Sequence, residues 1–311
     1  MKDIRACPVC ARSDGEELFH PQASPGTVVR CRQCGMVYIA KIDREEALIF
    51  DGPVVDASTD RDILTTANLA DVQNSWEYSL LPDKEAEWPA LERNAQDALR
   101  RIEKQGGSRI PERKILDFGS GWGFFLATAK KQGWSTYGLE PLPACAAYAR
   151  ATFGVEVVTD TLRKDSFPPS FFDVVTSFQV FEHLPTPLEN VCVLHDLLKL
   201  GGLILIEVPN FDTWSMKLLG ARHRHFVQDH LNFFSIATLS QLLMRAGFQV
   251  VDSYHSTRLM SMRHLIKHWL PKYLPFMARP GVQNAVASTP LWEMTMGFNI
   301  GDIIAVIGRK G

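Results

Sequence analysis

Neither sign of charge dominates this chain, and this absence bears first on its partners. The 311 residues include 33 Lys and Arg against 35 Asp and Glu, a formal net charge of −2. Proteins that bind nucleic acid through its phosphates usually carry a strong basic excess or a basic patch. The balance therefore argues against nucleic acid as a partner, although it leaves room for a local basic face.

Long apolar runs are also absent. No uninterrupted apolar stretch approaches the roughly 18–20 residues that span a bilayer. The first six residues lead straight to a cysteine, without the apolar segment of a secretory signal. Hydrophobic residues at 46% and charged residues at 22% are ordinary for a globular protein. We therefore expect a cytoplasmic protein with one large domain and an accessory piece.

Cysteine is scarce but clustered. Four of the six cysteines form two C-x-x-C pairs, Cys7 with Cys10 and Cys31 with Cys34, separated by twenty residues. In a reducing compartment such pairs are more often metal ligands than disulfides. Two of them can place four thiolates tetrahedrally around zinc, in a closed and therefore structural site. We predict a zinc-ribbon module over residues 1–40; redox exchange is the alternative, but neither pair has a thioredoxin-like context.

The next segment has helical periodicity. In the stretches 84–88 and 91–104, apolar residues recur at three- and four-residue spacing among charged ones, which is typical of an amphipathic helix. The Gly-Gly-Ser sequence at 106–108 then interrupts the pattern. We assign residues 41–110 to a helical linker or substrate cap.

Strands and helices alternate in the rest of the chain, which predicts an α/β fold. Five apolar stretches with helical connections indicate a doubly wound, mainly parallel sheet with right-handed crossovers. Two later stretches would add an antiparallel hairpin, making seven strands. The expected strands are 115–118, 136–140, 155–159, 172–178, 203–208, 248–254 and 303–307.

A glycine-rich turn follows the first of these strands. The segment Asp-Phe-Gly-Ser-Gly-Trp-Gly occupies residues 117–123. Its glycines allow a sharp turn and close approach to a ligand, and the following helix start offers unpaired amides. A tight turn alone would also explain such a triplet. Glu140 strengthens the ligand interpretation, because an acid at the end of the next strand can accept hydrogen bonds from both hydroxyls of a ribose.

Together these residues resemble the first motif of class I S-adenosylmethionine (SAM) dependent methyltransferases, which reads D-x-G-x-G-x-G, unlike the G-x-G-x-x-G of dinucleotide enzymes. The resemblance implies that Asp117 holds the methionine amino group, that Glu140 binds the ribose and that residues 160–161 contact adenine. The implied cofactor residues are Asp117, Gly119, Ser120, Gly121, Trp122, Glu140, Asp160, Thr161 and Gln179.

The resemblance covers about residues 113–255 and includes later motifs at 172–184, 200–210 and 230–235. In these motifs the chain is similar to the ubiquinone-biosynthesis O-methyltransferases and to small-molecule or sugar methyltransferases of that branch. It implies a SAM-binding domain of Rossmann-like methyltransferase fold over residues 111–311.

Three polar residues are candidates for the chemistry. His183 follows the fourth strand at the edge where open α/β sheets bind ligands, and a histidine can act as a base near neutral pH. It fits a structural turn with Glu182 equally well. His230 either orients the acceptor or bridges two connections. The cluster of His223 and His225, followed by Asp229 and His230, has no spacing typical of metal ligands.

A basic and aromatic insert occupies residues 256–295. Its first part, 256–280, has five Lys and Arg residues and no acid. It could cover the pocket, make a peripheral contact with an anionic membrane surface, bind a phosphorylated acceptor, or form a dimer contact. Pro271 and Pro275 argue against one long interfacial helix. The oligomeric state is not predicted.

The sequence therefore favours methyl transfer from SAM to a small-molecule, sugar or glycolipid acceptor, at oxygen, by an enzyme with structural zinc. An RNA methyltransferase that uses its zinc ribbon for recognition is one alternative. The N-P-P-[YF] signature is missing, however, because Asn210 lies between Pro209 and Phe211. An inactive SAM-binding adaptor is the other alternative.

Overall fold

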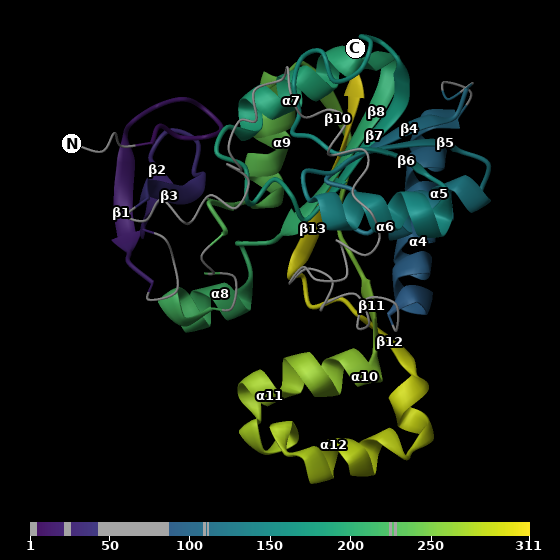
Figure 1. The fold of residues 1–311 in the computed structure, drawn as a ribbon. Helices are drawn as coiled ribbons and strands as arrows, with labels where there is room; N and C mark the ends of the chain where they lie inside the picture. The colour runs from purple at the N-terminus through teal and green to yellow at the C-terminus, as the bar shows by residue number, and fades with distance from the viewer. Residues whose placement is uncertain are drawn as a thin grey trace.

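The computed structural model describes residues 5–21, 26–42, 87–107, 110, 112–223, 226 and 229–311 (Figure 1). Residues 84–86 of the stretch predicted as helix at 84–88, and most of the predicted cap at 41–110, lie outside the described residues. The stretch predicted as helix at 91–104 lies within α4 (Trp88–Gly106).

A seven-stranded sheet forms the centre of the molecule, in the order β10-β13-β8-β7-β4-β5-β6. The strands from β6 to β8 are parallel, and β13 is antiparallel to both of its neighbours, β8 and β10. The strands are β4 (Lys114–Phe118), β5 (Ser135–Leu139), β6 (Glu156–Val158), β7 (Phe172–Phe178), β8 (Leu198–Pro209), β10 (Phe248–His255) and β13 (Ile303–Lys310). This confirms the predicted doubly wound, mainly parallel sheet with a late antiparallel pair.

Helices cover both faces of this sheet. Leu99 and Ile102 of α4 pack with Ile115 and Leu205 on one face. Leu194 of α7 and the helix α9 pack on the other face. Burial of such apolar side chains stabilises the layers by about 25 cal/mol per Å² removed from water. The other helices of the domain are α5 (Phe124–Lys131), α6 (Pro143–Phe153), α7 (Pro187–Leu197), α8 (Trp214–Leu219), a short 3₁₀ turn η4 (Gly220–Arg222) and α9 (Ile236–Arg245).

Local sequence explains where several of these helices begin and end. Pro143 occupies the first turn of α6, where a missing N–H is harmless, and Gly154 ends this helix with a left-handed φ of 59°. Ser235 caps α9 in a capping box with Thr238.

The cysteine module has its own four-stranded sheet, in the order β1-β2-β3-β9. Three strands come from the N-terminus: β1 (Gly15–Phe19), β2 (Gly26–Cys31) and β3 (Val37–Ile42). The fourth, β9 (Asn232–Phe233), comes from the later part of the chain and pairs antiparallel with β3. In Figure 1 the module lies at the left, beside the central sheet. A strand from the second half of the chain therefore completes the N-terminal sheet, whereas the predicted division of the chain at residue 40 stays a prediction.

The insert leaves the central sheet where β10 ends and returns where β13 begins. Both points lie at the edge formed by the carboxyl ends of the parallel strands, because Ile303 pairs with Pro209. The insert forms the helical arm at the bottom of Figure 1. It comprises β11 (Arg258–Ser261), α10 (Met262–His264), the π-helix η5 (Leu265–Trp269), α11 (Leu270–Tyr273), η6 (Pro275–Ala278), α12 (Pro280–Ala287), η7 (Pro290–Glu293) and β12 (Thr295–Phe298).

The effect of the two prolines differs. Helical backbone continues from Met262 through Pro271 to Tyr273, and it is interrupted at Leu274, before Pro275. Only the second proline therefore coincides with the predicted break. No helix among the described residues is long and apolar enough to cross a membrane.

Candidate functional site

The glycine turn lies between β4 and α5 and has a left-handed backbone at three positions. Gly119, Gly121 and Gly123 have φ angles of 77°, 50° and 79°. A Cβ on Gly119 would lie 2.3 Å from Val180 Cγ2, so a larger residue would collide with the loop after β7. A Cβ on Gly121 would meet nothing within 4 Å. The turn is thus packed at its start and open at Gly121, as expected for a ligand cradle.

Asp117 lies at the end of β4 and is almost completely buried, with 2% of its surface exposed. Its carboxyl accepts a hydrogen bond of 2.7 Å from the Thr176 hydroxyl on β7. Burial raises the pKa of Asp117 to about 8, and the nearby Glu140 carboxylate also raises it. A cation bound beside Asp117 would therefore favour the ionised form of this carboxyl group and lower its pKa.

Glu140 follows β5 and faces the turn. Its two carboxylate oxygens accept hydrogen bonds from the backbone amides of Gly121, at 2.7 Å, and Leu142, at 3.0 Å. Burial raises the pKa of Glu140. The structure thus brings together Asp117, Gly121 and Glu140, which the sequence places on successive strand ends.

Three neighbouring residues complete this region in different ways. The hydroxyl of Ser120 and the side-chain nitrogen (Nε2) of Gln179 are buried without a hydrogen-bond partner among the described residues. Gln179 also has a left-handed φ of 57°, an uncommon conformation that clusters at functional sites. Trp122 instead packs edge-on against Tyr148 of α6, with ring centroids 5.4 Å apart. Ser120 and Gln179 therefore offer polar atoms to a ligand, while Trp122 supports the turn from behind.

The remaining predicted cofactor residues lie after β6. Asp160 accepts a hydrogen bond of 2.8 Å from the Thr161 amide, and its second carboxylate oxygen pairs with Arg163. Both carboxylate oxygens thus contact their own loop. The loop follows a strand next to β5, at the same edge of the sheet as Glu140.

The three predicted catalytic residues are adjacent. The rings of His183 and His230 contact edge to face, with centroids 4.8 Å apart. His183 Nε2 lies 3.9 Å from a carboxylate oxygen of Glu182. Ligand atoms of all three lie within 4.8 Å of one another. This composition suits either acid–base chemistry or a metal ion.

His183 is held in one orientation. Its Nδ1 lies 2.9 Å from the carbonyl oxygen of Asp229 and 3.4 Å from a carboxylate oxygen of the same residue. Donation from Nδ1 to the carbonyl leaves Nε2 as the basic atom of the ring. Burial lowers the pKa of His183, so the ring is neutral at pH 7.

The loops that carry the two histidines are tied together through the backbone. The amides of Leu231 and Asn232 donate to the carbonyl of Glu182, at 2.7 and 2.9 Å. The Asn232 side chain donates to the carbonyls of Phe181 and Leu184, at 2.8 Å each. The site therefore forms where the turn after β7 meets the approach to β9.

The four cysteines converge as predicted. Cys7 Sγ lies 3.5 Å from Cys34 Sγ, and Cys10 Sγ lies 3.4 Å from Cys31 Sγ. All four sulfur atoms lie within 4.8 Å of one another. Tetrahedral zinc with Zn–S distances of about 2.3 Å separates its sulfur ligands by about 3.8 Å.

The turns of the module support this arrangement. The amide of Gly35 donates to the Cys31 carbonyl at 2.9 Å, and its φ is 75°. Burial raises the pKa of the Cys34 thiol to about 11, so a thiolate there needs a cation beside it. The residues thus fit a structural zinc ion.

The histidines at positions 223 and 225 have no spacing typical of metal ligands, and only one of them lies within the described residues. Arg224 and His225 lie outside the described residues, and His223 is buried. Among the described residues, His230 joins Glu182 and His183 instead.

A cleft of about 460 Å³ opens between the cysteine module and the segment after β8. Apolar side chains of Phe19, Val37, Phe211 and Met216 line it, together with Lys217. It therefore spans both halves of the molecule. None of the predicted site residues lines this cleft.

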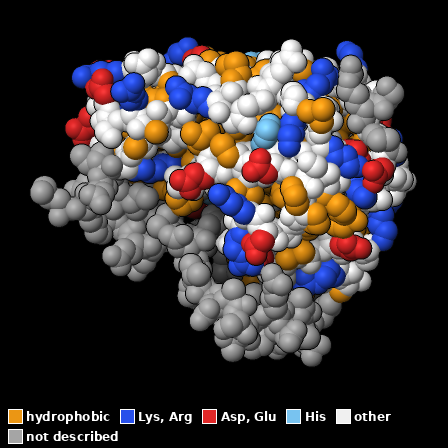
Figure 2. All heavy atoms as spheres, turned by 90° about the horizontal axis from the view of Figure 1, so that it is seen from above, with side chains coloured by type: hydrophobic (Ala, Val, Ile, Leu, Met, Phe, Trp, Pro, Cys, Tyr) orange, Lys and Arg blue, Asp and Glu red, His pale blue; other side chains and the backbone are white. Residues whose placement is uncertain are grey.

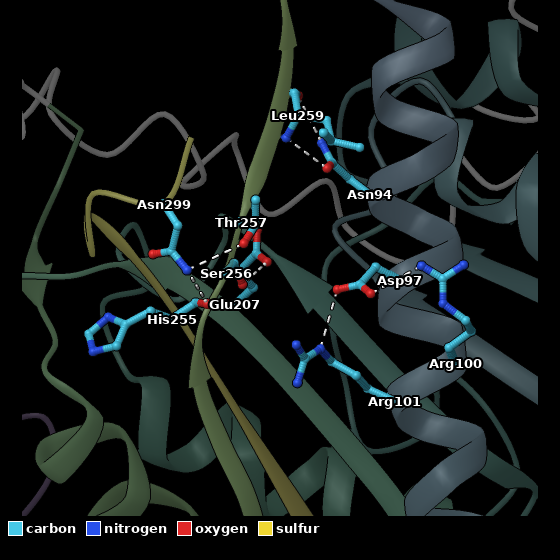
Figure 3. A network of polar contacts seen from close by, with 10 residues as sticks. All are labelled: Asn94, Asp97, Arg100, Arg101, Glu207, His255, Ser256, Thr257, Leu259 and Asn299. Atoms are coloured by element: carbon cyan, nitrogen blue, oxygen red, sulfur yellow. Dashed lines mark hydrogen bonds and ion pairs between the residues drawn. The ribbon is translucent and has the colours of Figure 1, made fainter. Parts of the chain in front are cut away.

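The base of the insert is fixed to α4 (Figure 3). The Asn94 side chain donates to the carbonyl of Leu259 and accepts from its amide, at 3.1 and 3.0 Å. Ser256 donates to Glu207 of β8 at 2.7 Å, and Asn299 donates to the carbonyl of His255 at 3.3 Å. The arm thus leaves the sheet from an anchored base. Farther out, Leu274 and Phe276 are 43% and 50% exposed.

The end of the molecule opposite this arm carries mixed charge. In Figure 2, Lys and Arg side chains are interspersed with Asp and Glu side chains. The described residues of this face therefore do not form the single-sign field expected of a surface that binds phosphates.

Comparisons with known proteins agree with the geometry. The methyltransferase-domain family matches residues 90–253, just over half of the chain. The ubiquinone biosynthesis O-methyltransferase of Yersinia pestis (strain Pestoides F) is 32% identical over 149 residues, covering 45% of this chain and 61% of that protein. An equivalent protein of Yersinia pseudotuberculosis serotype O:1b (strain IP 31758) matches to the same extent. The chain thus spans about three fifths of the length of the curated relatives it matches.

Among solved structures, one chain of the complex between the Haloferax volcanii Trm112 methyltransferase activator and a methyltransferase aligns with a TM-score of 0.50. It is 15% identical, and the alignment covers 78% of this chain and 97% of that chain. Likeness at this identity shows the fold alone. The family match and the fold together establish that this chain belongs to the methyltransferase-domain family.

Proposed function

We propose that this protein is a SAM-dependent methyltransferase that methylates a small-molecule acceptor at oxygen. The observation that carries the proposal is the convergence of Asp117 and Glu140 on the open turn at Gly121. SAM has an ammonium group and a ribose with two hydroxyls, which match a buried carboxyl and a second carboxylate. The name of the Yersinia relatives supports an oxygen acceptor.

In this proposal the residues of the turn bind and orient the cofactor. Asp117 pairs with the ammonium group, and Glu140 exchanges one of its amide contacts for the ribose hydroxyls. The side-chain nitrogen of Gln179 and the hydroxyl of Ser120 gain partners that they lack among the described residues. When bound, SAM supplies the electrophilic methyl group. Orientation of donor and acceptor can supply much of the rate enhancement.

The histidine pair supplies the proton chemistry. His183 is neutral, and Nε2 is the basic atom of its ring, because Nδ1 donates to the Asp229 carbonyl. It accepts the proton of the acceptor hydroxyl as the methyl group is transferred. His230, in ring contact with His183, orients the acceptor or shares the proton.

The cysteine module holds a structural zinc ion in this proposal. The sulfur separations of 3.4 and 3.5 Å are close to those of tetrahedral zinc sites. All four ligand positions come from protein, so the ion takes no part in methyl transfer and stabilises a small module with little core of its own.

The test is transfer of label from methyl-radiolabelled SAM into an extract of host cells. The products are then separated into small molecules, lipids and glycans, and RNA. We expect label in nuclease-resistant small-molecule material. Label in lipid or glycan material would instead place the acceptor there, and nuclease-sensitive label would favour an RNA methyltransferase. SAM binding without any transfer would favour an inactive adaptor.

A further inference from the structure

One side chain of the cysteine module reaches both histidine-bearing loops. The Arg5 guanidinium donates to the carbonyls of Leu184 and Pro185, at 3.2 and 2.7 Å, and its Nε donates to Pro185 at 3.1 Å. The same group donates to the carbonyl of Leu231, at 3.3 Å, and to the side-chain oxygen of Asn232, at 2.8 Å. A single residue therefore joins two chain segments that are far apart in sequence.

The positions of these contacts relate directly to the site. Pro185 lies two residues after His183, and Asn232 lies two residues after His230. The Arg5 contacts therefore fall at equivalent places just beyond each histidine. Because the two imidazoles are in ring contact, a change in the spacing of these segments alters the His183–His230 geometry directly.

The module fixes the position of Arg5 in turn. The Arg5 amide donates to the carbonyl of Ala40 at 2.7 Å, and Arg5 lies two residues before Cys7. The amide of Ile39 donates to the carbonyl of Leu231 at 2.9 Å, next to the β3–β9 pairing. The first cysteine turn and β3 thus hold the guanidinium against the second histidine loop.

We propose that Arg5 is a positioning residue for the acceptor site, through which the cysteine module sets the geometry of His183 and His230. The inference rests on the proposed function, since it assigns these histidines to the acceptor site. It gives the module a role in turnover beyond its own stability.

Arginine suits this task for a physical reason. Its planar guanidinium presents five N–H donors in a fixed fork, whereas lysine offers a compact point charge. Four oxygen atoms from two loops surround the Arg5 fork. Loss of the side chain leaves these oxygens without this donor, so that the Asn232 side chain, which donates to the Leu184 carbonyl at 2.8 Å, remains as the side-chain link between the two loops.

The experiment compares the zinc-loaded full chain with its Arg5→Ala variant and with Arg12→Ala as a matched control. Arg12 is an exposed arginine of the same module. Zinc content and SAM affinity are measured first. Long-range ¹⁵N–¹H NMR spectra then report which nitrogen of His183 and His230 carries the proton. This readout needs no acceptor and no turnover.

We expect Arg5→Ala to keep its zinc and to change the SAM dissociation constant by less than about twofold, because Arg5 does not contact the glycine turn. We expect the His183 spectrum to change from one Nδ1–H form to a mixture, and methylguanidinium but not methylammonium to reverse the change. Once an acceptor fraction is available, kcat falls about tenfold or more, with a smaller change in KM. Arg12→Ala changes none of these quantities.

Unchanged histidine spectra in zinc-loaded Arg5→Ala would overturn the proposal. If Arg5→Ala does not fold, Arg5→Lys is measured in the same way, since it keeps the charge but loses the fork. Wild-type histidine spectra in that variant would overturn the proposal equally. Altered spectra with no methyl transfer even in the wild type would contradict the proposed function while leaving the positioning role of Arg5 intact.

Discussion

The Glu140 carboxylate accepts a hydrogen bond of 2.7 Å from the backbone amide of Gly121, so the acid after β5 is connected directly to the glycine turn after β4. Nineteen positions of sequence separate the two residues. Their contact arises because β4 and β5 are parallel neighbours whose carboxyl ends meet at one edge. It joins the two halves of the proposed SAM site.

Replacing Glu140 with alanine should weaken SAM binding about 10- to 100-fold, because hydrogen bonds to a charged group contribute about 1.5–3 kcal/mol. Calorimetric titration measures the affinity. Glu156→Ala is the matched control, since Glu156 is exposed on the neighbouring strand β6. Unchanged affinity in a folded Glu140→Ala protein would remove the ribose assignment.

SAM affinity should rise with pH up to about 8, because the pKa of Asp117 is raised to about 8 from its ordinary 3.8. An ammonium ligand favours the ionised carboxyl, so binding below that pH releases a proton. The raised pKa also affects stability. As the pH rises from 3.8 to about 8, the unliganded protein loses folding stability, because Asp117 ionises in the unfolded chain but stays protonated in the folded one.

Calorimetry in buffers of different ionisation enthalpy measures the released proton. Asp117→Asn should abolish the release and weaken binding. Proton release that persists in Asp117→Asn would assign it to another group.

Replacing His183 with alanine should lower kcat about 10²- to 10⁴-fold, the usual contribution of a general base, without changing SAM affinity. The kcat of the wild-type protein should fall on the acid side only below pH 6.5, because burial lowers the pKa of His183 from that ordinary value. A base is active when neutral, so a lowered pKa extends activity toward acid. His20→Ala, at an exposed histidine of the cysteine module, is the control. A His183→Ala enzyme with wild-type kcat would assign this residue a structural role only.

One zinc ion should bind per chain and should be lost when Cys7 and Cys10 are both replaced by serine. Serine cannot supply a thiolate, and structural zinc contributes much of the folding energy of small modules. Metal analysis of the purified protein measures the content. Cys192→Ser tests specificity, because Cys192 is an exposed cysteine of α7. Wild-type protein without zinc would contradict the assignment.

Replacing Asn94 with alanine should loosen the base of the insert, since both hydrogen bonds between this side chain and Leu259 disappear. Each contributes about 0.5–1.5 kcal/mol. Hydrogen exchange of residues 258–261 should become faster. Asp97→Ala, one turn along α4, removes contacts within the helix only and should leave that exchange unchanged. Equal exchange in Asn94→Ala and the wild type would show that the anchor lies elsewhere.

The sequence predicted the central sheet well because its signals are local. Apolar stretches such as 115–118 and 172–178 are strands in the structure, and the glycines after the first strand predicted the turn. The cysteine spacing likewise predicted the four-sulfur cluster, since each pair brings its own tight turn. Such features depend on residues close together in the chain.

Long-range features were missed for the opposite reason. The sequence of the two-residue strand at Asn232 and Phe233 does not predict its pairing with β3. The sequence around Arg5 likewise does not predict the hydrogen bond of this residue to Pro185, which forms only in the folded chain. The left-handed backbone of Gln179 could not be predicted either, because glutamine has no preference for this conformation. For Arg5, the available signal was that a side chain with several hydrogen-bond donors stands two residues before Cys7.

The central claim is that this chain transfers the methyl group of SAM, and formation of S-adenosylhomocysteine tests it most directly. The purified protein is incubated with SAM, with and without host-cell extract, beside a Glu140→Ala control. The account predicts S-adenosylhomocysteine that depends on the extract, matches the methyl label incorporated, and falls sharply in the variant. SAM binding at one site per chain with no S-adenosylhomocysteine above the variant's level would contradict the account and identify a binding protein.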